Sequence, residues 1–240
     1  MDCVIERIAE QLPPITEGER DFAHIMNKPE PERHPKYWYR HKETGAEYAW
    51  LEGGFAPPGY EYPGFAVIIA FDRVEHPDHD VRFIRVLEEF EAERQQDIEG
   101  LLKACVQLQK KYGCYPLLNT GFYTELDEAS SDRVYNIVSN LYGDESQFWP
   151  QSTSQYTGRI IPFQQYLATL AHYKKNLDVH LCPKLQNYML MVKKGKEFTR
   201  LKPEDIPAIA AIAYAVFALV GKKPWRVELP EESVYELEIE

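Results

Sequence analysis

The stretch from residue 64 to residue 121 limits the fold more than any other part of the chain. It opens with GFAVIIAFDR (64–73), a short apolar run rich in β-branched and aromatic residues, which predicts a buried strand. A turn-rich segment follows, and VRFIRVLEEF (81–90) then predicts a second strand that pairs with the first. Two such strands in sequence indicate an antiparallel pair at the centre of a sheet.

A long helix and a further strand complete this stretch. The segment 93–113 carries one apolar stripe at helical spacing, formed by Ile98, Leu101, Leu102, Cys105 and Leu108. CYPLLNTG (114–121) then predicts a strand that ends at Asn119. Strands alternating with a helix in this order predict an α/β fold with a mixed sheet and a right-handed crossover. Because chemistry in such sheets collects beyond the carboxyl ends of the strands, Asn119 is a candidate site residue.

The remaining segments divide the chain into three parts. Residues 1–45 are expected to form an N-terminal extension, with a helix over 1–12 and a proline-rich linker. Residues 46–225 form the domain itself, and residues 226–240 an acidic tail. A β-hairpin is predicted with arms at Tyr37–His41 and Tyr48–Leu51. Further helices are predicted over 126–144, over 161–176, from about Pro183, and over 202–221, the last being almost wholly apolar.

Composition excludes several classes of protein. Hydrophobic content of 44% and charged content of 27% are ordinary for a soluble globular chain of 240 residues. No apolar run is long enough to span a bilayer and no secretory leader opens the chain, so we expect no membrane association and a cytoplasmic location. The four cysteines are widely spaced and contain no CxxC pair, which indicates neither a zinc site nor a disulfide framework.

The net charge of −11 argues against strong binding to nucleic acid, since phosphate contacts need a basic face. One local cluster could supply such a face, and it consists of Lys193, Lys194, Lys196, Arg200 and Lys202. The alternative is a solvated helix end with its loop. DNA binding, where it occurs, is therefore expected to be weak and dependent on salt.

Three polar residues follow or begin predicted elements in a pattern that suggests a metal site. Glu52 ends an aromatic strand at a Gly-Gly pair, Asn119 ends a later strand, and Asp205 begins the last helix. Carboxylates converging from such elements are what a two-metal phosphodiester-cleaving site requires. The alternatives are an exposed strand-end carboxylate, a turn residue and a helix cap, respectively.

From Trp50 to Phe217 the order of elements resembles the ribonuclease H-like nuclease domain of phage terminase large subunits, the DNA-packaging motors. The segments that carry this resemblance are LEGGFAPPGYEYPGFAVIIAFD (51–72), GRIIPFQQYLATLAHYKKNLDVHLCPKLQNYMLMV (158–192) and EDIPAIAAIAYAVFAL (204–219). The resemblance implies a ribonuclease H-like mixed sheet flanked by helices, and Mg²⁺ or Mn²⁺ held by Glu52 and Asp205. No phosphate loop is found, so no motor ATPase is expected.

The chain departs from the family pattern at several site positions. Glu52 stands where the family usually has Asp, and Asn119 stands where its second Asp is expected. In the last helix Asp205 is kept, but Pro207 replaces a histidine and Ala210 a later Asp. Because Asn supplies no negative charge and Ala no ligand, the resemblance supports the fold more than the activity. Glu125 or Asp127, just after Asn119, are possible substitutes.

Three functions follow as hypotheses. The first is a terminase-type, metal-dependent DNA endonuclease domain from a phage or prophage, with a partly degenerate site, acting in the bacterial host cytoplasm with packaging proteins. The second is a non-catalytic ribonuclease H-like protein that binds a protein partner or DNA. The third is a small-molecule enzyme that uses the tyrosine-rich loop 55–63 as a lid.

Overall fold

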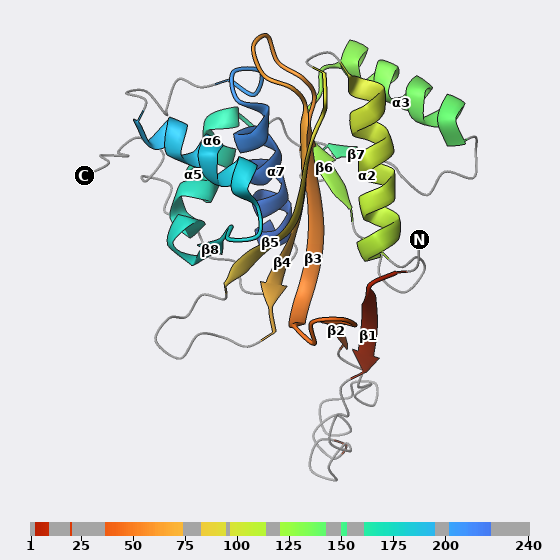
Figure 1. The fold of residues 1–240 in the computed structure, drawn as a ribbon, viewed down its shortest axis with the longest axis vertical. Coiled ribbons are helices and arrows are strands. Elements are labelled where there is room, and N and C mark those ends of the chain that lie inside the picture. The colour runs from red at the N-terminus through yellow and green to blue at the C-terminus, as the bar shows by residue number, and fades with distance from the viewer. Residues whose placement is uncertain are drawn as a thin grey trace.

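The computed structural model describes residues 3–9, 20, 37–73, 83–94, 97–113, 121–142, 150–152, 161–194 and 202–221. The strands are β1 (Ile5–Ala9), β2 (Tyr37–His41), β3 (Glu47–Ala56), β4 (Phe65–Asp72), β5 (Ile84–Glu91), β6 (Phe122–Thr124), β7 (Pro150–Ser152) and β8 (Leu177–Asp178). The helices are α2 (Ile98–Gly113), α3 (Glu128–Tyr142), α5 (Phe163–Tyr173), α6 (Pro183–Lys194) and α7 (Pro207–Gly221). Figure 1 shows their arrangement.

All of these strands belong to one mixed sheet. β3, β4 and β5 are antiparallel neighbours, and β6 lies parallel to β3 on its other side. β7 in turn lies parallel to β6. The expected α/β fold, a ribonuclease H-like mixed sheet flanked by helices, is therefore confirmed.

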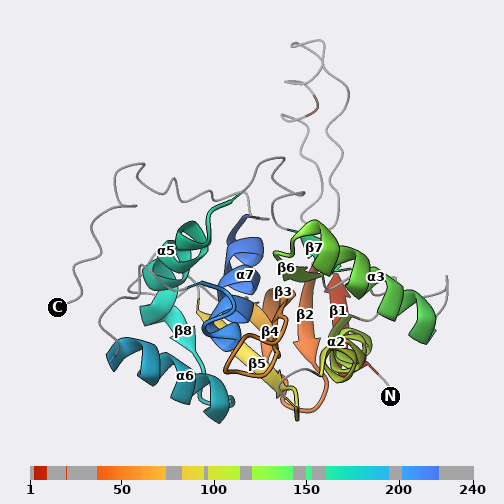
Figure 2. The same ribbon diagram turned by 90° about the horizontal axis from the view of Figure 1, so that it is seen from above.

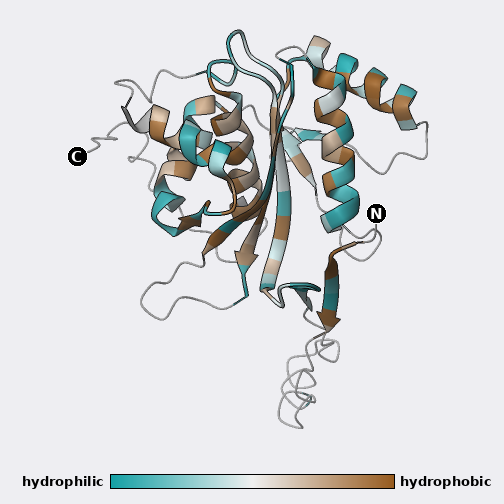
Figure 3. Ribbon diagram, in the orientation of Figure 1, coloured by the Kyte–Doolittle hydropathy of each residue, from teal (hydrophilic) through white to brown (hydrophobic). Residues whose placement is uncertain are grey.

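Helices cover both faces of the sheet (Figure 2). α5, α6 and α7 pack on one face, where they bury Val67 and Ile69 of β4. α2 and α3 pack on the other, against Leu51 and Phe55 of β3. On α2, hydrophobic and hydrophilic residues alternate along the ribbon (Figure 3), as expected for a helix with one buried stripe. Every residue from Phe65 to Ala70 is inaccessible to solvent, because both faces of β4 are covered.

α7 lies unusually close to the sheet because the contact is made by very small residues. A Cβ atom at Gly54 would overlap the carbonyl oxygen of Ala211 and would lie 2.8 Å from the Cβ of Ala215. Only glycine on β3 and alanine on α7 allow this approach. The Gly-Gly pair of the sequence is therefore a packing feature of β3.

Most predicted elements are confirmed. The hairpin of β2 and β3 has the predicted arms, and Leu101, Leu102 and Cys105 on α2 are fully buried. The helix predicted over 1–12 is wrong in the described part, because residues 5–9 form a strand that pairs antiparallel with β2. β1 and β2 lie before residue 46 in the sequence, and they extend the same sheet beyond β3. The strand predicted at 114–119 and the tail 226–240 lie outside the described residues.

Of the described cysteines, one is disulfide-bonded and two are free thiols. The sequence gives no sign of a disulfide, but Cys3 is disulfide-bonded. Cys105 and Cys182 are free and buried, and burial raises the pKa of the Cys182 thiol to about 12, which makes it unreactive. Among the described helices, none is both long enough and apolar enough to cross a bilayer.

Candidate functional site

Glu52, the first predicted metal ligand, is a completely buried residue in the middle of β3. Its Oε1 atom accepts a hydrogen bond of 2.6 Å from the indole N–H of Trp50. Its Oε2 atom accepts one of 3.0 Å from the backbone N–H of Gly121, the residue before β6. Both carboxylate oxygens are thus engaged by donors of the protein itself. Glu52 is therefore neither the exposed strand-end carboxylate nor an open metal ligand.

The surroundings of Glu52 explain why a carboxylate is buried there. The same edge of β3 pairs with β2 at Tyr48 and with β6 from Gly53 onward, so the two neighbouring strands separate between these points. Glu52 lies at this fork and ties the start of β6 to β3, next to a backbone bond of 2.7 Å from Gly53 N–H to the Gly121 carbonyl. The carboxylate therefore stabilises the junction of three strands.

Tyr39 of β2 is a buried neighbour of Glu52 at this fork. Its ring meets that of Trp50 edge to face, with centroids 6.0 Å apart. Burial raises the pKa of Tyr39, and the negative charge of Glu52 raises it further, while Arg7 acts in the opposite direction. Glu52 therefore lies among aromatic side chains where water is largely excluded.

Asp205, the second predicted ligand, is exposed in the turn before α7. Its Oδ2 atom accepts a 2.8 Å hydrogen bond from the backbone N–H of Lys202. α7 runs antiparallel to β3: Gly54 faces Ala211, and a Cβ atom at Gly59 would overlap the carbonyl oxygen of Glu204. The rise of helix and strand then separates Asp205 from Glu52 by roughly 15–20 Å.

Glu52 and Asp205, two of the three predicted site residues, are therefore not brought together. Glu52 and Asp205 are too far apart to share two cations about 4 Å from one another. Asn119 lies outside the described residues. Across those residues, no group of three His, Cys, Asp or Glu side chains could hold a metal ion.

The structure brings together a different set of polar residues at the carboxyl ends of β6 and β7. Glu125, directly after β6, accepts a hydrogen bond of 2.7 Å from the Tyr166 hydroxyl of α5. It accepts another of 3.1 Å from the Ser152 hydroxyl at the end of β7. From the sequence alone, Glu125 is considered only as a replacement for Asn119 in the predicted metal site. A strand parallel to β3 and next to it is expected from the sequence, but at 114–119; the strand that pairs in this way is β6, so Glu125 is the carboxylate that follows its end.

Tyr214 extends this cluster from α7. Its ring lies edge to face with that of Tyr166, with centroids 5.0 Å apart. Burial raises the pKa of Tyr214 well above its ordinary value, and the charge of Glu125 contributes. Its hydroxyl oxygen is buried and has no hydrogen-bond partner among the described residues. Two tyrosines from different helices thus enclose one side of the Glu125 carboxylate.

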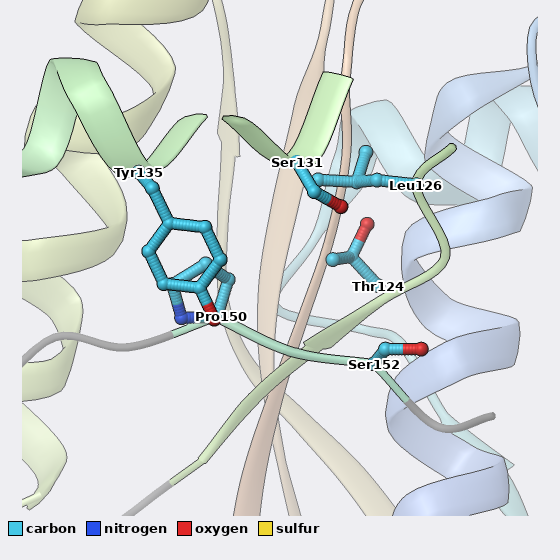
Figure 4. A pocket seen from close by; sticks show the side chains of 6 residues that line it. All are labelled: Thr124, Leu126, Ser131, Tyr135, Pro150 and Ser152. Atoms are coloured by element: carbon cyan, nitrogen blue, oxygen red, sulfur yellow. The ribbon is translucent and has the colours of Figure 1, made fainter. Parts of the chain in front are cut away.

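A small pocket with a volume of about 20 Å³ lies at β6, β7 and the first turns of α3 (Figure 4). It is lined by Thr124, Leu126, Ser131, Tyr135, Pro150 and Ser152. Thr124 is 2% exposed, and its hydroxyl has no hydrogen-bond partner in the described part of the chain. In Figure 4 the hydroxyl oxygens of Thr124 and Ser131 point toward one another. We call this feature the hydroxyl pocket.

The predicted basic cluster is described only in part. Lys193 and Lys194 end α6, and Lys202 is exposed just before α7. Lys196 and Arg200 lie outside the described residues. The predicted DNA contact of this cluster stays a prediction.

Comparison with known proteins adds no relative: no protein-family model, curated protein or solved structure matches this chain.

Proposed function

We propose that the chain is a ribonuclease H-like binding protein related to terminase nuclease domains. In this proposal it keeps the fold of a two-metal nuclease but uses it to hold a partner. The observation that carries the proposal is the position of Glu52. The two oxygens of this carboxylate accept hydrogen bonds from Trp50 and Gly121 inside an aromatic fork. The carboxylate therefore stabilises the sheet and is not directed at a phosphate.

The residues present do not fit the pair of cations that the terminase resemblance implies. Two Mg²⁺ or Mn²⁺ ions need several carboxylate oxygens directed at one point. Using Glu52 as a ligand would break the bonds to Trp50 and Gly121 and leave two buried donors unpaired, which costs about 1–3 kcal/mol each. We therefore expect at most one weakly bound cation, near Glu125 or Asp205, and we derive no catalytic step through a metal.

The test is a nuclease assay on the complete chain. Supercoiled plasmid is incubated with the protein and Mn²⁺ or Mg²⁺, and Mn²⁺ binding is measured in parallel by titration calorimetry. The expected result is no nicking above a buffer control. Mn²⁺-dependent nicking that disappears in both Asp205→Ala and Glu125→Gln would overturn the proposal, because a contaminating nuclease would be unaffected by these changes.

A second candidate is a nuclease whose site has moved to Glu125. The observation in its favour is that Glu125 follows a strand parallel to β3, at the sheet end where the turn containing Asp205 also lies. Glu125→Gln separates the two candidates. If the site has moved to Glu125, this change should lower Mn²⁺ affinity and nicking together, whereas the binding-protein proposal expects no nicking in either protein.

DNA or a protein is the proposed partner, and the two are distinguished by salt. A DNA contact through the basic cluster is expected to weaken steeply between low and physiological salt. A gel-shift titration with duplex DNA at several salt concentrations measures this slope. A complex that does not respond to salt would exclude the basic cluster as the contact.

A further inference from the structure

The residues before β1 lie against the C-terminal end of α2. The backbone N–H of Val4 donates a hydrogen bond of 2.9 Å to the carbonyl oxygen of Lys111, which is in the last turn of α2. Lys42, directly after β2, donates to the Cys3 carbonyl at 2.6 Å through Nζ and to the Val4 carbonyl at 2.8 Å through its backbone N–H. These contacts fix Cys3 and Val4 beside the end of α2.

Cys3 is disulfide-bonded, and its partner follows by exclusion. The sequence contains four cysteines, of which Cys105 and Cys182 are free and buried. Because the structure is a single chain, the bond lies within it, and Cys114 is the one cysteine left to form it. Cys114 itself lies outside the described residues.

The place of Cys114 in the sequence agrees with this pairing. It directly follows Gly113, the last residue of α2, and it is three residues from Lys111. Three residues of chain span at most about 10 Å, and a disulfide requires Cα atoms about 5.5 Å apart. Because Val4, next to Cys3, contacts Lys111, the length of the chain permits the bond.

We propose that a reversible Cys3–Cys114 disulfide fastens β1 to the end of α2. The bond closes the loop from residue 3 to residue 114, and closing a long loop stabilises most. β1 pairs with β2 and with no other described strand, and Ile5 is its one side chain in the buried core against α2. An N-terminal strand at the edge of a sheet is among the first elements to open. The attachment of β1 therefore depends on the redox state of two cysteines.

Thiol–disulfide exchange with a small-molecule disulfide, such as oxidised glutathione, forms the bond. The thiolate of one cysteine attacks the glutathione disulfide, which gives a mixed disulfide and releases one glutathione thiolate. The second cysteine attacks the mixed disulfide and releases the other. The two protein thiols thereby lose two electrons and two protons, and glutathione disulfide becomes two thiols. The reverse sequence opens the bond, so it is expected to be transient wherever the thiol pool is reducing.

Peptide mapping of the complete chain tests the pairing. The chain is equilibrated with oxidised and reduced glutathione at several ratios, its free thiols are trapped in denaturant with N-ethylmaleimide, and it is digested with trypsin. Cleavage after Lys and Arg places the four cysteines in four separate peptides, which are 1–7, 104–110, 112–133 and 176–184. We expect a disulfide between 1–7 and 112–133 that increases with oxidised glutathione. Cys3 that is trapped at every ratio, or 1–7 linked to itself or to another peptide, would overturn the pairing.

Variants test the effect of the bond on stability. The oxidised wild-type chain should unfold at a urea concentration about 1 M higher than the reduced chain. Cys3→Ser and Cys114→Ser should each abolish this difference, and the double variant should behave as either single variant does. Cys182→Ala changes a free cysteine, so it is the matched control and should keep the difference. A difference that survives in Cys3→Ser would contradict the proposal.

Hydrogen exchange locates the effect in the chain. The amides of β1 should exchange at least about tenfold faster in the reduced than in the oxidised wild type, whereas those of β4, which is covered on both faces, should not change. Equal protection of β1 in the two states would show that the bond does not hold this strand. None of these measurements involves DNA, a metal or a partner, so the bond is tested independently of the proposed binding function.

Discussion

The substitution Glu52→Gln tests most directly whether the buried carboxylate serves the sheet. Glutamine has nearly the same shape, but only one of its two terminal atoms accepts a hydrogen bond. In the wild-type chain both terminal atoms accept, from the Trp50 indole at 2.6 Å and from the Gly121 amide at 3.0 Å. One of these buried donors must therefore face the side-chain NH₂ group of glutamine.

The expected loss of stability follows from these two contacts. A hydrogen bond to a charged group contributes about 1.5–3 kcal/mol, and an unpaired buried donor costs about 1–3 kcal/mol. Part of this loss is offset, because neutral glutamine avoids the free-energy cost of burying a charge. We expect Glu52→Gln to lower the free energy of unfolding by about 2–3 kcal/mol.

A double-mutant cycle with Trp50→Phe sharpens this prediction. Phenylalanine removes the indole donor, so glutamine can turn its oxygen to Gly121 and its NH₂ group toward the vacated side. Glu52→Gln should then cost about 1–2 kcal/mol less in the Trp50→Phe background than in the wild type. Urea unfolding followed by circular dichroism measures all four variants. Glu99→Gln, which removes an exposed ion pair with Lys103 on α2, is the control and should cost less than about 0.5 kcal/mol.

Two results would contradict a structural role of the Glu52 carboxylate. A Glu52→Gln protein as stable as the wild type, but with Mn²⁺ binding lost, would make Glu52 a metal ligand. An absence of coupling with Trp50→Phe would show that the indole contact is energetically irrelevant.

Three further predictions concern packing, pH and DNA. Gly54→Ala should destabilise the chain by about 1–3 kcal/mol, seen as a lower urea midpoint, because its methyl group would overlap the Ala211 carbonyl; an unchanged midpoint would contradict this packing. The hydrogen bond from Arg73, and then that from Arg40, hold the pKa of Glu47 below its ordinary value of 4.5. Its contribution is therefore present above pH 4.5 and lost as the pH falls through the lower folded-state pKa, so Glu47→Gln should flatten the acid side of a stability-pH profile. An identical profile in the variant would argue against this ion pair. Neutralising the basic cluster should abolish any low-salt binding to duplex DNA in a gel-shift assay, and binding that survives would exclude the cluster, which consists of Lys193, Lys194, Lys196, Arg200 and Lys202.

The elements that the sequence predicts best are those whose burial is decided locally. The apolar run of β4 and the stripe on α2 each repeat with the period of their own structure, so both are recognisable without knowledge of their neighbours. The apolar helix α7 is recognised for the same reason.

The elements that were missed depend on distant partners. The residues of β1 fit a helical pattern, yet Ile5 faces the core only because the strand pairs with β2, more than two dozen residues away. The role of Glu52 depends on Gly121, and that of Glu125 on the register of β6 against β3. No local periodicity contains this information, so residue type alone suggested a metal site where the fold builds a strand junction.

The close packing of α7 on β3 also affects when the chain can complete its folding during synthesis. β3 and β4 leave the ribosome early, whereas the helix that covers one of their faces is the last described element. Until α7 arrives, the apolar surface of β4 on that side lacks its final cover, in a topology dominated by long-range pairings. A nascent or truncated chain that ends before Pro207 is therefore expected to aggregate or to engage chaperones, since nothing earlier in the described sequence offers a helix with small enough side chains to occupy the same place.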